Sequence, residues 1–104
     1  MSIKLALLKS GETVVSDIKE ILNAEQKVRA YILNKPHVIQ AKHQMFLAEG
    51  QEPEDREIQI TLSPWIILTE DEDMVIPIDW VVTIVEPIAS VKTVYEEKIN
   101  GQDS

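Results

Sequence analysis

The chain contains no cysteine among its 104 residues. Disulfide bonds and thiolate metal sites are therefore excluded, and the composition permits a reducing compartment. No apolar run approaches the roughly 18 residues of a membrane-spanning helix, and the N-terminus lacks the regions of a signal peptide. We therefore expect one domain over residues 1–104, located in the cytoplasm and without membrane contact.

Glycine is also scarce, with three isolated residues in the whole chain. A phosphate-binding loop is absent, and so is a Gly-x-Ser-x-Gly nucleophile motif. These absences predict a protein that is not an enzyme and has no cofactor. His37 and His43 have no carboxylate between them, so we predict surface histidines and no metal site.

The charge is strongly negative overall but unevenly distributed. The net charge is −8, which disfavours binding to nucleic acid. Residues 1–48, however, hold seven Lys/Arg and four Asp/Glu, whereas residues 49–104 hold three and fourteen. An acidic total is therefore compatible with one basic face.

Apolar and polar residues alternate with a period of two along most of the chain, which predicts strands. Ser10-Gly11 marks the first turn, and Pro36 bends the third strand. The expected strands cover 3–9, 12–22, 28–33 continuing at 37–42, 57–68 with a break at Pro64, 74–78 and 81–86. Trp65 is expected to pack in the core, since apolar residues follow it.

The apolar period changes near the C-terminus. Ile88, Val91, Tyr95 and Ile99 lie three and four residues apart, which places them on one buried helical face. This pattern predicts a helix over 88–99 within the C-terminal segment 86–100. Residues 43–56 are expected to form a mobile acidic loop.

Five or six short strands and one helix predict a mainly β fold. We expect a small, strongly bent β-barrel of about five strands with a C-terminal helix. A β-sandwich is the alternative.

The first hairpin resembles the first motif of Sm-like (LSm) proteins, the family that includes Hfq. The matching residues are Leu5, Leu7, Leu8, Gly11, Val14 and Ile18. Val75–Pro87 resembles the last two strands of the same family. The C-terminal helix with Tyr95-Glu96-Glu97-Lys98 is similar to that of Sm-like proteins carried by marine bacteriophages. Ser16 stands where the family usually has a second glycine, and Asp79-Trp80 where it has Arg-Gly or Lys-His.

This resemblance implies a homo-oligomeric ring, from pentamer to heptamer, that binds RNA or single-stranded DNA in nucleic-acid processing. Lys27 and Arg29 are two residues apart at a strand start, and we expect them on one face against phosphates. Asn23 is expected to hydrogen-bond a base or sugar, and Trp80 to stack on a base. The alternative is a structural or protein-interaction ring that binds no nucleic acid.

Overall fold

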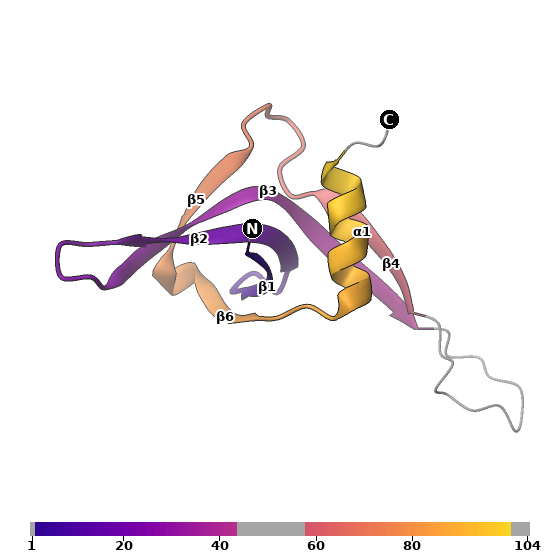
Figure 1. The fold of residues 1–104 in the computed structure, drawn as a ribbon, viewed down its shortest axis with the longest axis horizontal. Helices are drawn as coiled ribbons and strands as arrows, with labels where there is room; N and C mark the ends of the chain where they lie inside the picture. The colour runs from indigo at the N-terminus through magenta and orange to yellow at the C-terminus, as the bar shows by residue number, and fades with distance from the viewer. Residues whose placement is uncertain (1, 44–57, 101–104) are drawn as a thin grey trace, which may run out of the picture.

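The computed structural model of the protein describes residues 2–43 and 58–100 (Figure 1). Its elements follow the predicted order, and the strand expected over 57–68 ends at Pro64. The predicted acidic loop at 43–56 lies outside the described residues, apart from His43 at the end of β3. The elements are β1 (Ile3–Leu8), β2 (Thr13–Leu22), β3 (Val28–His43), β4 (Ile58–Pro64), β5 (Asp73–Pro77), the 3-10 helix η2 (Ile78–Trp80), β6 (Val81–Val85) and α1 (Ala89–Ile99).

The strands form one antiparallel six-stranded sheet in the order β4-β3-β2-β1-β6, and β5 also pairs with β3. The first and last strands are therefore neighbours, with Leu5 opposite Val85 and Leu7 opposite Thr83. Between β1 and β2, Gly11 has a φ of 94°, which a residue with a side chain rarely adopts. The amide of Gly11 donates to the carbonyl of Leu8 at 2.9 Å and closes this turn.

The long strand β3 is kinked at Lys35, whose φ is 51°. Before the kink β3 pairs with β5, and after it β3 pairs with β4. On the opposite edge, the register with β2 shifts, so that Ser16 faces the two residues Lys35 and Pro36. Such a bulge bends the strand locally, which lets one strand serve two partners along the same edge.

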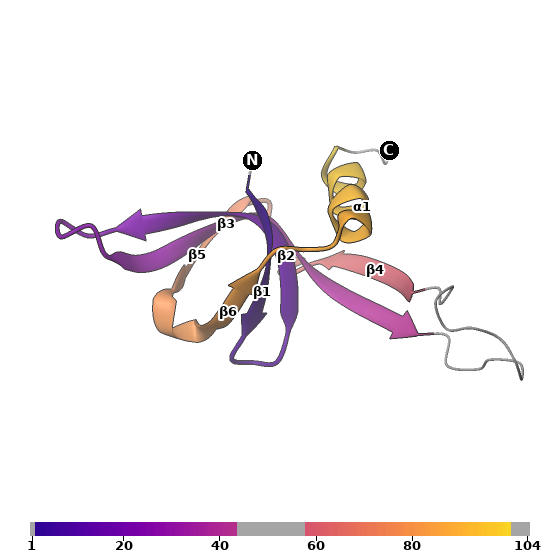
Figure 2. The ribbon, with the colours of Figure 1, turned by 60° about the horizontal axis from the view of Figure 1, so that its bottom comes forward.

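The bent sheet encloses a first apolar core on its inner side, where Figure 2 shows β1, β2, β5 and β6 curving around a common centre. A second core lies on the other side, between the sheet and α1. Successive residues of β2 serve different cores, since Val14 belongs to the first and Val15 to the second. We expected one buried face on the first hairpin, but bending covers one face and α1 covers the other.

The two cores share no residue. The first consists of Ala6, Leu8, Val14, Ile18, Leu33 and Ile76, and the second of Ile3, Val15, Leu62, Val91 and Tyr95. Trp65 is half-buried against the first core, as predicted.

The apolar face of α1 is confirmed for three of its four predicted residues. Val91 and Tyr95 are buried, and Ile99 packs at the edge of the second core. Ile88 is 60% exposed because it is the N-cap and precedes the first helical turn. Within the described chain, no helix is long and apolar enough to cross a membrane.

The mainly β architecture with one C-terminal helix agrees with the sequence, whereas the sheet is open. In the described residues β4 and β5 pair only with β3, and β6 pairs only with β1. The hydrogen-bond ladder therefore ends at these strands, and the predicted closed barrel is not formed by ladders within one chain. The short helix η2 joins β5 to β6 across this opening.

Candidate nucleic-acid interface

Asn23 shapes the turn between β2 and β3. Its side-chain oxygen accepts hydrogen bonds from the amides of Glu25 at 2.8 Å and Lys27 at 3.0 Å. Gln26 has a φ of 67°, which this tight turn requires. The side-chain oxygen of Asn23 therefore holds the turn, a role that asparagine often fills.

Lys27 and Arg29 are both exposed at this hairpin. Lys27 precedes β3, and Arg29 is the extra residue of a bulge, because Ala30 pairs with Ile21 and Val28 pairs with Leu22. The regular alternation that would place both side chains on one strand face is therefore interrupted. The two cations share a hairpin end rather than one strand face.

Trp80 is 41% exposed at the end of η2. Its carbonyl accepts a hydrogen bond of 2.9 Å from the amide of Lys9, which is itself exposed. Lys9 was not among the predicted binding residues, since only the pairing of β6 with β1 brings it beside Trp80. The exposed ring of Trp80 is of the kind on which a nucleic-acid base can stack, and Lys9 is its neighbour through the backbone.

The predicted residues do not converge on one point. Pro77 pairs with Ala30, so η2 starts beside Arg29 and ends beside Lys9. We call Arg29, Trp80 and Lys9 the η2 strip. Asn23 and Lys27 lie further along the hairpin, whose tip projects beyond η2 in Figures 1 and 2.

A cavity of about 440 Å³ opens on the inner side of the sheet, next to the hairpin. Lys19 and Tyr31 line it together with Lys4 and Glu20. The sequence offered no signal for this cavity, because only the pairing of β2 with β3 places Tyr31 opposite Glu20. Its charges are mixed, since Lys4 and Lys19 line it beside Glu20.

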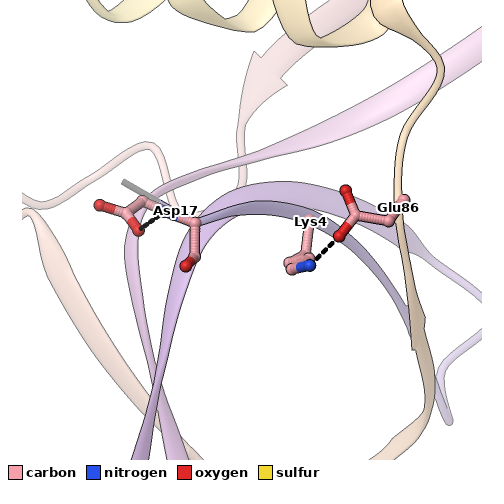
Figure 3. Close-up of polar contacts among 4 residues, drawn as sticks. Lys4, Asp17 and Glu86 are labelled. Atoms are coloured by element: carbon pink, nitrogen blue, oxygen red, sulfur yellow. Dashed lines mark hydrogen bonds and ion pairs between the residues drawn. The ribbon is translucent and has the colours of Figure 1, made fainter.

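Polar contacts tie the start of β1 to its neighbours (Figure 3). The ammonium of Lys4 pairs with the carboxylate of Glu86, and the amide of Ser2 donates to Oδ1 of Asp17 at 3.0 Å. The hydrogen bond and charge of Lys4 lower the pKa of the exposed Glu86. The ammonium of Lys4 is thereby paired with a carboxylate on the same surface.

His37 is buried rather than at the surface, contrary to the prediction. Its Nδ1 lies 2.9 Å from the carbonyl of Lys35, and its ring meets Tyr95 edge-on at 5.8 Å between centroids. Burial lowers the pKa of His37, the charge of Lys98 adds to this, and the bond to Lys35 opposes it. In residues 2–43 and 58–100, no three His, Asp or Glu side chains gather as a metal site.

Residues 1–100 match DUF6561, which is described as a family of unknown function. No protein with a curated description matches the chain. Because the family match covers nearly all of its length, the chain belongs to the DUF6561 family.

Proposed function

We propose that the protein is a subunit of a homo-oligomeric, Sm-like ring that binds single-stranded RNA or DNA. The observation that carries this proposal is the pairing of the last strand, β6, with the first, β1. It supports the Sm-like resemblance, in which the C-terminal strand returns to the first hairpin. It also leaves an outer edge on β6 and another on β4.

The composition of β6 favours assembly through its outer edge. Val81–Val85 contains no charge and no proline, and Val82 and Val85 are 59% and 50% exposed. An uncharged, half-exposed edge strand pairs readily with another strand. Pairing with β4 of a neighbouring copy satisfies both edges, and repetition of this head-to-tail contact closes a ring. The barrel expected for one chain would then be completed between subunits.

The η2 strip is the proposed nucleic-acid contact. Trp80 offers a ring for stacking, and Arg29 and Lys9 offer charges for phosphates. One subunit supplies too few cations for tight binding, particularly with the acidic Asp79 exposed beside Trp80. A ring repeats the strip in every subunit, so that weak contacts act together at a high effective concentration.

A ring that binds protein instead of nucleic acid is the second candidate. The net charge of −8 and the exposed acidic run from Glu70 to Asp73 favour it. Negative charge repels a phosphate backbone, whereas it attracts a protein partner with a basic surface. The two candidates share the assembly and differ only in what the ring binds.

Light scattering and fluorescence anisotropy test both parts of the proposal. Wild-type protein is expected to scatter as an oligomer and to bind labelled oligouridine or oligothymidine weakly, with an affinity that falls steeply as salt rises. Lys9→Glu and Trp80→Ala should each weaken binding, whereas Lys98→Glu, on α1, should not. A monomeric wild type would refute the ring. An oligomer without binding at low salt would refute the nucleic-acid function and favour the protein-binding ring.

A further inference from the structure

Three consecutive apolar side chains stand in solvent on the connection from β4 to β5. Ile66, Ile67 and Leu68, here called the apolar tip, are 46%, 71% and 93% exposed. The connection is anchored by Trp65, whose Nε1 donates to Oε1 of Glu12 at 3.1 Å and whose ring packs on the first core. A contiguous group of exposed apolar side chains on an anchored connection is typical of an interaction surface.

An apolar groove of about 400 Å³ lies elsewhere on the same molecule, between the sheet and the start of α1. We call it the α1 groove. Its walls are mainly aliphatic, which suits aliphatic side chains rather than a polar ligand. The lining residues are Leu5, Thr13, Ile39, Ile60, Glu86, Ile88 and Val91.

The charges beside the tip and at the start of α1 are complementary, and Glu86, which lines the groove, is paired with Lys4. The first turn of α1 contains no acidic residue, and its N-cap, Ile88, makes no side-chain capping bond. The exposed Lys92 lies in the same turn. The start of a helix is electropositive and favours a nearby carboxylate. Glu70 and Asp71 are exposed immediately beyond the apolar tip and can supply that charge.

We propose that the apolar tip of one copy docks in the α1 groove of a second copy, with Glu70 and Asp71 beside the start of the second copy's α1. Figure 1 shows the β4–β5 connection near the end of α1, whereas Ile88 in the groove precedes its start. The two surfaces therefore lie at opposite ends of the helix, and the contact joins copies head to tail. The contact pairs with neither sheet edge, and the one residue of an edge strand that lines the groove is Ile60 of β4.

Cysteine cross-linking tests this contact directly, because the natural chain has no thiol. Leu68→Cys and Ile88→Cys alter exposed side chains and leave both cores intact. Mixed and oxidised together, these variants are expected to form a disulfide-linked heterodimer, identified by intact mass. A disulfide needs Cα atoms within about 4.4–6.8 Å, so the bond reports close contact. The yield should exceed by about tenfold that of Leu68→Cys mixed with Leu22→Cys, a matched exposed position on the hairpin.

A second arm tests the charge complementarity. Adding Glu70→Lys and Asp71→Lys to the Leu68→Cys chain should lower the heterodimer yield at least about threefold. Glu20→Lys and Glu25→Lys change the net charge equally on the hairpin and should leave the yield unchanged. Cross-linking at the control level from both Leu68→Cys and Ile67→Cys would overturn the proposal. That result would leave the β6 contact standing, because the mass of Val82→Lys, a variant of the β6 edge, tests the ring contact separately.

Discussion

The hydroxyl of Tyr95 in α1 donates a hydrogen bond of 2.9 Å to the carbonyl of Asn34 in β3. The carbonyl of Lys35 lies 3.1 Å from the same hydroxyl, and the amide of Asp17 donates to it at 3.3 Å. Oγ of Ser16 also lies 2.9 Å from the Asn34 carbonyl. The bulge between β2 and β3 leaves these backbone groups outside the regular ladder, and buried groups of this kind need partners. The C-terminal helix supplies one with a side chain that is fully buried.

Tyr95→Phe is expected to lower the free energy of unfolding by about 1–2 kcal/mol, because the bulge loses a hydrogen-bonding partner while the ring is kept. Urea denaturation followed by circular dichroism measures this change. Tyr31→Phe, at a half-buried tyrosine of β3, is the matched control and should lower the free energy of unfolding by a smaller amount. Equal stability of Tyr95→Phe and wild type would show that the hydroxyl is dispensable.

Alkaline pH should destabilise the protein through Tyr95. Burial raises the pKa of Tyr95 to about 12, whereas an unfolded tyrosine ionises near 10. The unfolded state therefore loses its proton first, and the free energy of unfolding falls as pH rises from about 10 to 12, by roughly 2–3 kcal/mol. Denaturation of wild type and Tyr95→Phe across this range isolates the effect. The two stability curves should converge and then cross as pH rises towards 12, and parallel curves would contradict the raised pKa.

Mild acid should destabilise the protein through His37. Burial lowers the pKa of His37 from its ordinary value of 6.5, so the unfolded state takes up a proton more readily than the folded state. The stabilisation is complete above the unfolded pKa and is lost as pH falls below it. Thermal unfolding between pH 7.5 and 5 measures this effect. The free energy of unfolding should fall less steeply with falling pH for His37→Gln than for wild type, and the two slopes should differ by the equivalent of on the order of one bound proton. Identical slopes would show that His37 titrates alike in both states.

Val82→Lys should split the proposed ring without unfolding the subunit. Val82 is 59% exposed on the uncharged strand β6, and a lysine there opposes pairing with a second edge. Light scattering should report a lower mass for this variant than for wild type, while circular dichroism is unchanged. Val75→Lys is the control, since Val75 is 62% exposed on β5. A variant with the mass of the wild-type oligomer would exclude β6 from the interface.

Local patterns in the sequence determined most of the secondary structure. Period-two alternation predicted the first strands, because successive side chains on a strand point to opposite faces whatever lies across from them, and short apolar runs predicted the last two. The spacing of Val91, Tyr95 and Ile99 likewise predicted the buried face of α1, which the structure confirms. Trp65 was correctly expected in the core, but the apolar residues after it are exposed. Hydrophobicity alone does not show whether the chain has already left the sheet.

The tertiary structure alone decided which distant residues meet. No local pattern in Val81–Val85 states that it pairs with β1, yet this pairing brings Lys9 to Trp80 and leaves β6 as an edge. The same holds for Tyr95, which lies far along the chain from the Asn34 carbonyl that it binds. Asn23 holds a turn as well, because its side-chain oxygen accepts hydrogen bonds from neighbouring amides, and the sequence alone did not show this role. The period of the apolar residues shows which side of a helix or strand is buried. Which strands pair, and which partners the buried polar groups bind, depends on what the whole fold places beside each element.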